Sequence, residues 1–288
     1  MYLPGQDLGG LRVDLGTIPL GGVDDQGVAW PLQEMDGWDS PEVRAEVHQR
    51  AADHGAWLGP RYLAERPVTL AGKIIAPGAA ELDAAMERLR AAIPLDTTVL
   101  TVRETVPKQA TVTRSGKVLL RHLTDSVAEF SVMVTAGDPR RYGVDEEVES
   151  TTLPSATGGL VFPATFPVAF SATVVAGEIR AVNAGTFETR PAFTVDGPVS
   201  APQIIGLYAD GTTRQLAYGQ DLAAGDQLVI DTDAPTVTLN GTASRRRFLA
   251  VPSGWPTIPA NSTVTYQFRA AAPAPAALLT ARWRSAWI

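Results

Sequence analysis

Three histidines are the side chains in this sequence best suited to acid–base catalysis or metal binding. They are His48, His54 and His122. A zinc site needs three or four ligands, and paired histidine ligands on a helix commonly lie one turn apart. His48 and His54, with Asp53 beside them, lack that spacing and a clear further ligand, and His122 belongs to another predicted element. We therefore predict surface histidines, with no catalytic residues and no metal ligands.

Two clusters of carboxylates could bind calcium or serve a glycosidase. They are the pair Asp24-Asp25 and the run Asp145-Glu146-Glu147. A glycosidase holds its two carboxyl groups about 5 to 9 Å apart across a cleft, which acids adjacent in sequence rarely achieve. We interpret the pair as part of a turn and the run as part of a solvated linker.

Basic and aromatic side chains offer two binding hypotheses. The run Arg245-Arg246-Arg247 could bind a polyanion, but three charges beside a strand more often protect a sheet edge or mark a subunit contact. Trp255, Trp283 and Trp287 could form a platform for sugar rings, whereas β-sandwich cores also bury tryptophan. We favour the interpretation that the arginines protect a sheet edge or make a subunit contact. For the tryptophans we favour burial in the core or at an interface.

Motifs and composition argue against most enzyme classes. The sequence has no nucleophile elbow, phosphate-binding loop or dinucleotide fingerprint. With no cysteine it cannot form disulfides or thiolate metal sites, and the net charge of −7 disfavours general binding to nucleic acids. The N-terminus lacks a secretory signal, and the apolar tracts are too short to cross a membrane. We predict no enzyme activity, no cofactor, no membrane insertion and assembly in the cytoplasm.

The elements that carry these residues are mainly β-strands. Among 288 residues, 26 glycines and 22 prolines indicate many turns, and the length suits two domains. Residues 79–93 predict one helix, because Leu82, Met86, Leu89 and Ile93 recur on one face. Further strands are predicted at residues 66–75, 98–103, 110–114, 117–122 and 127–135, with a hairpin within 10–28. Residues 30–59 read as an irregular insertion in which Ser40-Pro41-Glu42 could start a short helix.

The second half predicts a β-sandwich. Residues 226–248 read as a three-stranded meander, in which Asn240-Gly241 suits a type I′ turn. Further strands are predicted at residues 160–163, 168–175, 178–183, 192–195, 203–208, 263–269 and 278–287. We expect an N-terminal domain at residues 1–145, a linker at 146–159 and a C-terminal domain at 160–288.

The order of these parts resembles the distal tail proteins of long, non-contractile-tailed (siphovirus-like) bacteriophages, of the type called minor tail proteins in actinobacterial phages. The resemblance covers nearly the whole chain. In the first half it depends on DSPEVR at residues 39–44, GPRYLAERPVTLAGKI at 59–74 and AGDPRRY at 136–142. In the second half it depends on residues 183–204, on GDQLVIDTDAPTVTLNG at 225–241 and on WPTIPANSTVTYQF at 255–268.

This resemblance implies a fold and a role. The fold would be mainly β with one helix (α+β), combining an N-terminal split β-barrel like that of tail-tube subunits with a C-terminal galectin-like sandwich. The role would be structural: a ring, six subunits in this family, that joins the tail tube to the baseplate at the virion tail tip. Partners would be the tail tube protein, the tape measure protein and tail-tip proteins, while DNA passes through the lumen without specific binding.

Two other readings remain open at this point. In one, the C-terminal sandwich is a carbohydrate-binding module for adsorption to the host, which exposed coplanar aromatic side chains would favour. In the other, the chain is a glycosidase or peptidase, which convergent carboxylates in a deep cleft would favour.

Overall fold

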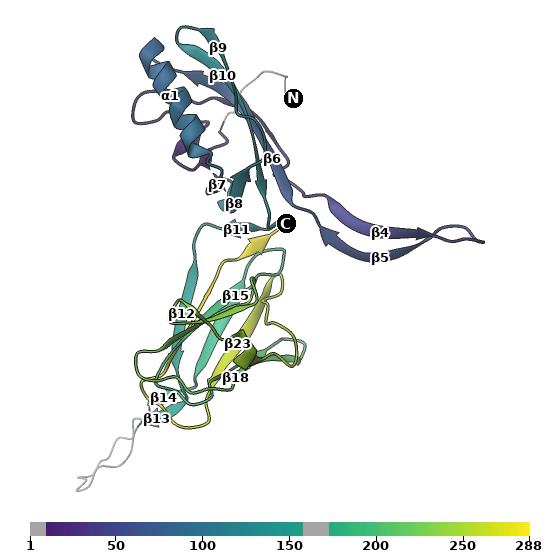
Figure 1. Cartoon of the computed structure of the whole chain (residues 1–288), viewed down its shortest axis with the longest axis vertical. Coiled ribbons are helices and arrows are strands. Elements are labelled where there is room, and N and C mark those ends of the chain that lie inside the picture. Colours follow the sequence, from purple (N-terminus) through teal and green to yellow (C-terminus); the bar gives the residue numbers. More distant parts are fainter. Residues whose placement is uncertain (1–9, 158–172) are drawn as a thin grey trace, which may run out of the picture. The chain divides into compact units, whose positions relative to one another are not determined.

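The computed structural model describes residues 10–157 and 173–288 (Figure 1). The chain divides into two compact units, residues 1–144 together with Ile288, and residues 145–287. Each unit buries its own hydrophobic core. This division lies beside the domain boundary expected from the sequence, and the mainly β fold with one helix is confirmed.

Antiparallel strands and one helix build the first unit. Its principal sheet has the order β2-β1-β7-β8-β10-β6-β3, with β9 also paired to β10 and β11 to β8, while β4 and β5 pair with each other. The bounds are β1 (Val13–Leu15), β2 (Ile18–Leu20), β3 (Leu32–Asp36), β4 (Val43–Gln49), β5 (Ala56–Leu63), β6 (Arg66–Ile75), α1 (Ala79–Ala92), β7 (Thr97–Val102), β8 (Lys108–Arg114), β9 (Leu119–Thr124), β10 (Val127–Ala136) and β11 (Arg141–Gly143).

The centre of this sheet follows from a two-residue period in the sequence. β6 and β10 pair along their full lengths, and alternate residues of each point into the core. Helix α1 lies against β6 and β2, and its apolar stripe of Leu82, Met86, Leu89 and Ile93 is buried. The predicted helix and stripe are therefore confirmed.

One prediction for the first unit is wrong. The segment expected to be an irregular insertion with a short helix at Ser40 instead contains β3 and the hairpin of β4 and β5. Ser40 and Pro41 precede β4, and no helix begins there. The chain prefers paired strands here because it has no apolar stripe at helical spacing that could pack on the sheet.

The second unit is a sandwich of two antiparallel sheets. One has the order β12-β24-β16-β19-β20-β21 and the other β15-β23-β17-β18-β22, while β13 and β14 form a separate pair. The bounds are β12 (Glu147–Thr152), β13 (Ser155–Thr157), β14 (Thr173–Val175), β15 (Glu178–Asn183), β16 (Ala192–Asp196), β17 (Gln203–Leu207), β18 (Thr213–Tyr218), β19 (Gln227–Asp231), β20 (Thr236–Leu239), β21 (Ala243–Ser244), the 3-10 turn η1 (Arg246–Phe248), β22 (Leu249–Ala250), β23 (Ser262–Arg269), β24 (Leu278–Trp283) and β25 (Ala286–Trp287).

Side chains from both sheets meet in the core of the sandwich. Phe193 of β16 and Tyr266 of β23 pack edge to face, with ring centroids 4.9 Å apart. The fully buried Asn183 donates its side-chain amide to the carbonyls of Phe187, Ile258 and Pro259 at 2.7 to 3.1 Å. These bonds supply polar partners for loops that enter the core, as burial of backbone groups requires.

Most of the expected linker at residues 146–159 forms strands in its described part, which ends at residue 157. Residues 147–152 form β12, which pairs along its length with β24, and residues 155–157 form β13. The acidic composition of this segment reflects an exposed edge strand, whereas Leu153 just beyond it is buried. The predicted strand at 160–163 lies outside the described residues, as does the predicted 168–175 strand except for β14.

The predicted meander of the second unit is present. β19 pairs with β20 and β20 with β21, and the turn residues Asn240 and Gly241 have φ values of 51° and 73°. Positive φ at both positions is what a type I′ turn requires.

Candidate functional site: the β4–β5 hairpin

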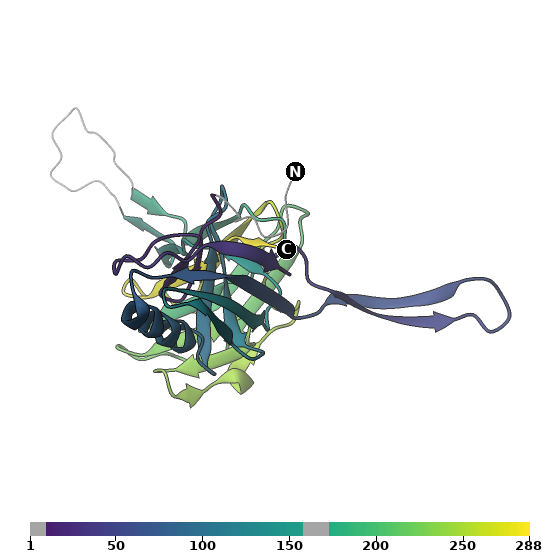
Figure 2. The same cartoon turned by 90° about the horizontal axis from the view of Figure 1, so that it is seen from above.

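The hairpin of β4 and β5 extends away from the rest of the first unit (Figure 2). Among the residues that the structure describes, these two strands pair only with each other. Every residue of β4 is exposed. An isolated two-stranded hairpin is marginally stable in water, and usually needs another surface to pack on.

Large apolar side chains lie on this hairpin without a core to bury them. Val47 and Leu58 face each other across the two strands, and His48 faces Trp57. The exposed fractions are 61% for Val43, 51% for Val47, 65% for Trp57, 58% for Leu58 and 64% for Tyr62. Monomeric proteins rarely expose such a group of large apolar side chains unless it is a contact surface.

The root of the hairpin is held by a buried arginine. Arg66, just beyond β5, has no exposed surface, and its guanidinium donates to the carbonyl of Pro139 at 2.8 and 3.0 Å and to that of Trp38 at 2.5 Å. Removal from water lowers the pKa of Arg66 to about 10, so it stays charged at neutral pH. The hairpin therefore projects from a fixed base.

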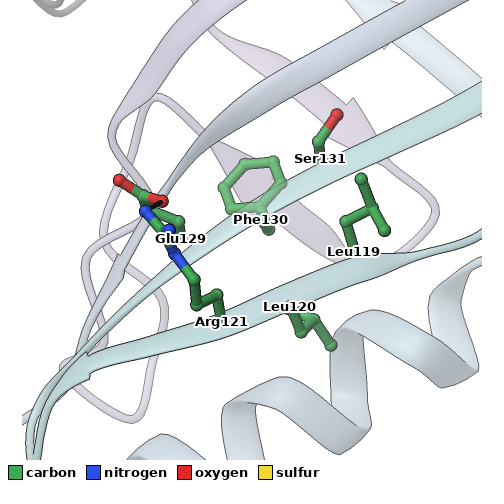
Figure 3. A pocket seen from close by; sticks show the side chains of 6 residues that line it. All are labelled: Leu119, Leu120, Arg121, Glu129, Phe130 and Ser131. Atoms are coloured by element: carbon green, nitrogen blue, oxygen red, sulfur yellow. Dashed lines mark hydrogen bonds and ion pairs between the residues drawn. The ribbon is translucent and has the colours of Figure 1, made fainter.

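A second surface feature is the shallow groove between β9 and β10 (Figure 3). Its lining combines apolar residues with the ion pair of Arg121 and Glu129, at 2.7 Å. Leu119 on its rim is 58% exposed, whereas Phe130 is buried. Glu129 is the one carboxylate among the residues that line this groove, and it is paired with Arg121, so the groove does not hold the two carboxylates that a glycosidase needs.

The structure does not bring the three histidines together. His48 lies on β4, 3.5 Å from Glu46, and His54 lies beyond the end of β4, beside Asp53. His122 lies on β9, with its Nε2 atom 3.3 Å from the Asp83 carboxylate. Across residues 10–157 and 173–288 there is no group of three or more side chains placed to hold a metal ion. All three histidines are exposed.

The two acidic clusters occupy different settings. The Asp24 side chain accepts hydrogen bonds from the backbone of Gln26 and Val28 and from Trp30 Nε1, and pairs with Arg88 of α1 at 2.8 Å. Burial acts to raise the pKa of Asp24, but these bonds outweigh it and leave the pKa lowered. Asp24 is therefore a structural anchor. The run 145–147 leads into β12 and is exposed.

The three tryptophans form no exposed platform. Trp283 is buried, and its Nε1 donates to the carbonyl of Val182 at 2.8 Å. The ring of Trp255 is covered by the guanidinium of Arg246, which lies 4.9 Å from the ring centroid. Trp287 is partly exposed and lies on β25, apart from β24. The observation that would have favoured a carbohydrate-binding module is therefore missing at these residues.

No helix in the described part of the chain is long and apolar enough to span a membrane.

Comparison with known proteins finds one family model that matches most of the second unit. Residues 184–287 match the model of the family described as siphovirus-type tail component, C-terminal domain. No curated protein sequence matches the chain.

Solved structures share the fold over nearly the whole chain. The SPP1 Dit protein, described as a paradigm of the hub adsorption apparatus in phages that infect Gram-positive bacteria, superposes with a TM-score of 0.64 at 12% identity, covering 96% of this chain and 99% of that one. A chain of the phage P2 baseplate in its activated conformation with Ca superposes with a TM-score of 0.51 at 11% identity, covering 94% and 97%. With the family match, these structures confirm the predicted resemblance to siphovirus distal tail proteins.

Proposed function

We propose that this chain is a siphovirus-type distal tail protein and that it forms a closed ring, of six copies, that joins the tail tube to the adsorption apparatus and lets DNA pass. The observation that carries the proposal is the β4–β5 hairpin, because it exposes large apolar side chains on a fixed base. In a ring, each hairpin packs on the next copy, which buries those side chains and completes the marginal two-stranded sheet.

In this proposal the protein has a structural role and lies at the virion tail tip. Assembly takes place in the host cytoplasm, and the neighbours are the tail tube, tape measure and baseplate proteins. A net charge of −7 per chain gives about −42 for six copies, and acidic groups along the lumen keep DNA from adhering during passage.

The hairpin is tested by placing charge at its exposed apolar pair, Val47 and Leu58. Val47→Glu combined with Leu58→Glu puts two carboxylates directly opposite each other on a surface that the ring would bury. We expect sedimentation analysis to show a loss of the oligomer, while each separate copy stays folded because neither residue belongs to a core.

The matched control uses another exposed leucine. Leu95 is 87% exposed and lies outside the hairpin, so Leu95→Glu adds one such carboxylate, against two in the hairpin variant, without touching the proposed contact. This variant is expected to keep the oligomer. The proposal fails if the hairpin variant assembles as well as the Leu95→Glu control.

A further inference from the structure

The two edges of one sheet in the second unit carry opposite charges. The order β12-β24-β16-β19-β20-β21 makes β12 and β21 the edge strands of this sheet. An edge strand presents unpaired backbone groups, so it is a place where another chain can dock. Four strands lie between the two edge strands. Neighbouring strands in a sheet are about 4.8 Å apart, so the two edges are well separated within one copy.

The β12 edge is acidic. Asp145 and Glu146 lead into it, Glu147 begins it and Glu149 lies within it, and all four residues are exposed. Within the described ranges, Asp145, Glu146 and Glu147 form no ion pair. Val148, which lies between Glu147 and Glu149, is 50% exposed. The acidic edge is therefore open to solvent and unneutralised.

The β21 edge is basic. Ser244 ends the strand and Arg245, Arg246 and Arg247 follow directly. In the part of the chain that the structure describes, none of the three arginines has a carboxylate within ion-pair distance. The Nε atom of Arg245 is buried without a hydrogen-bond partner.

Aromatic rings hold these arginines in place. The guanidinium of Arg247 lies 4.5 Å from the ring centroid of Phe248, and that of Arg246 lies over Trp255. Stacking of this kind orders the side chain and leaves N–H groups at the guanidinium edge to bind carboxylates. The aromatic faces are thereby occupied, so the edge is suited to bind acidic groups rather than sugar rings.

We propose that the basic β21 edge of one copy docks on the acidic β12 edge of the next copy. Contact between identical edges would bring like charges together, whereas contact between opposite edges pairs three arginines with Asp145, Glu146 and Glu147. A contact between two different surfaces of the same chain is heterologous, and it closes into a ring when the rotation between copies allows. The inference rests on the proposed ring and assigns a second, electrostatic contact to it.

Crosslinking tests this contact directly, because the chain has no cysteine of its own. A double variant, Ser244→Cys with Val148→Cys, places one thiol on each edge. The edges lie too far apart within one copy for a disulfide. We therefore expect oxidation to give a ladder of covalent multimers, whereas Ser244→Cys alone gives at most the background of dimers.

Charge reversal is the second test of this contact. In the double-cysteine background, replacing Arg245, Arg246 and Arg247 by glutamate is expected to reduce the ladder at least tenfold. Replacing Asp145, Glu146 and Glu147 by lysine in the same chain should restore it, which a merely unfolded variant cannot do. Lys117→Glu, at an exposed lysine of the first unit, is the control and should leave the ladder unchanged.

The outcomes separate this inference from the ring. A ring of the expected mass without a ladder above the single-cysteine background overturns the edge contact and leaves the proposed function standing. A ladder that survives arginine replacement also overturns it. If the chain forms neither a ring nor a ladder, both proposals fail.

Discussion

At the scale of single residues, buried polar groups fix the positions of the loops. Asp24 connects a tight turn, the Trp30 ring and helix α1 through four contacts. Asn183 does the same in the second unit, where its amide donates to three carbonyls and its oxygen accepts from the backbone of Gly185 and Ala286. Such groups are costly to replace, because their partners would remain buried without a hydrogen bond.

The lowered pKa of Asp24 predicts a pH-dependent contribution to stability. Its folded-state pKa lies below the ordinary value of 3.8, so the contribution is fully present above that value and is lost as pH falls through the folded-state pKa. We expect Asp24→Asn to lower the free energy of unfolding by about 1 to 3 kcal/mol at pH 7. The difference from the native chain should shrink in acid, as measured by denaturant titration.

The neighbouring acid provides the control for this measurement. Asp25 is exposed, and Asp25→Asn should change the free energy of unfolding by less than about 0.5 kcal/mol. A loss from Asp24→Asn that stays constant from neutral to acid pH would contradict the proposed ionic role.

At the scale of elements, the apolar stripe of α1 fastens it to the sheet of the first unit. Leu89 has no exposed surface and belongs to the core. Leu89→Ala should therefore cost about 2 to 5 kcal/mol, the sum of lost burial and the cavity left behind. Leu95→Ala makes the same change at a leucine that is 87% exposed, and thermal unfolding should show little effect there. Equal effects at the two leucines would be inconsistent with this packing.

The sequence predicts elements well where one face is buried and poorly where neither is. β6 and β15 were predicted at their observed bounds, because buried and exposed residues alternate along them. The hairpin is not predicted although Val43, Ala45 and Val47 alternate with polar residues, because no face of β4 is buried and so short an alternation does not by itself distinguish a strand from a loop. The candidate contact surface is not predicted either, because the sequence does not show that Trp57 and Leu58 are exposed rather than buried in a core. The sequence of the edge strand β12 resembles a linker for the same reason, because its acids have no buried face opposite them along most of its length.

At the scale of the whole molecule, each of the two units buries a hydrophobic core of its own, and each exposes a surface suited to contact with another chain. The first unit exposes the apolar hairpin, and the second exposes two sheet edges of opposite charge. Neither feature is useful to an isolated monomer, because exposed apolar strands and unpaired edges promote aggregation. Both become useful when each copy contacts two neighbours through different surfaces, as in a closed ring.

Native mass measurement of the purified chain tests the ring most directly. One chain has a mass of 30.5 kDa, so a ring of six copies should appear at about 183 kDa, at high concentration or with the neighbouring tail proteins present. Electron microscopy of the same sample should then show closed rings. A chain that stays at 30.5 kDa under all these conditions, with no ring in virions, would contradict the account.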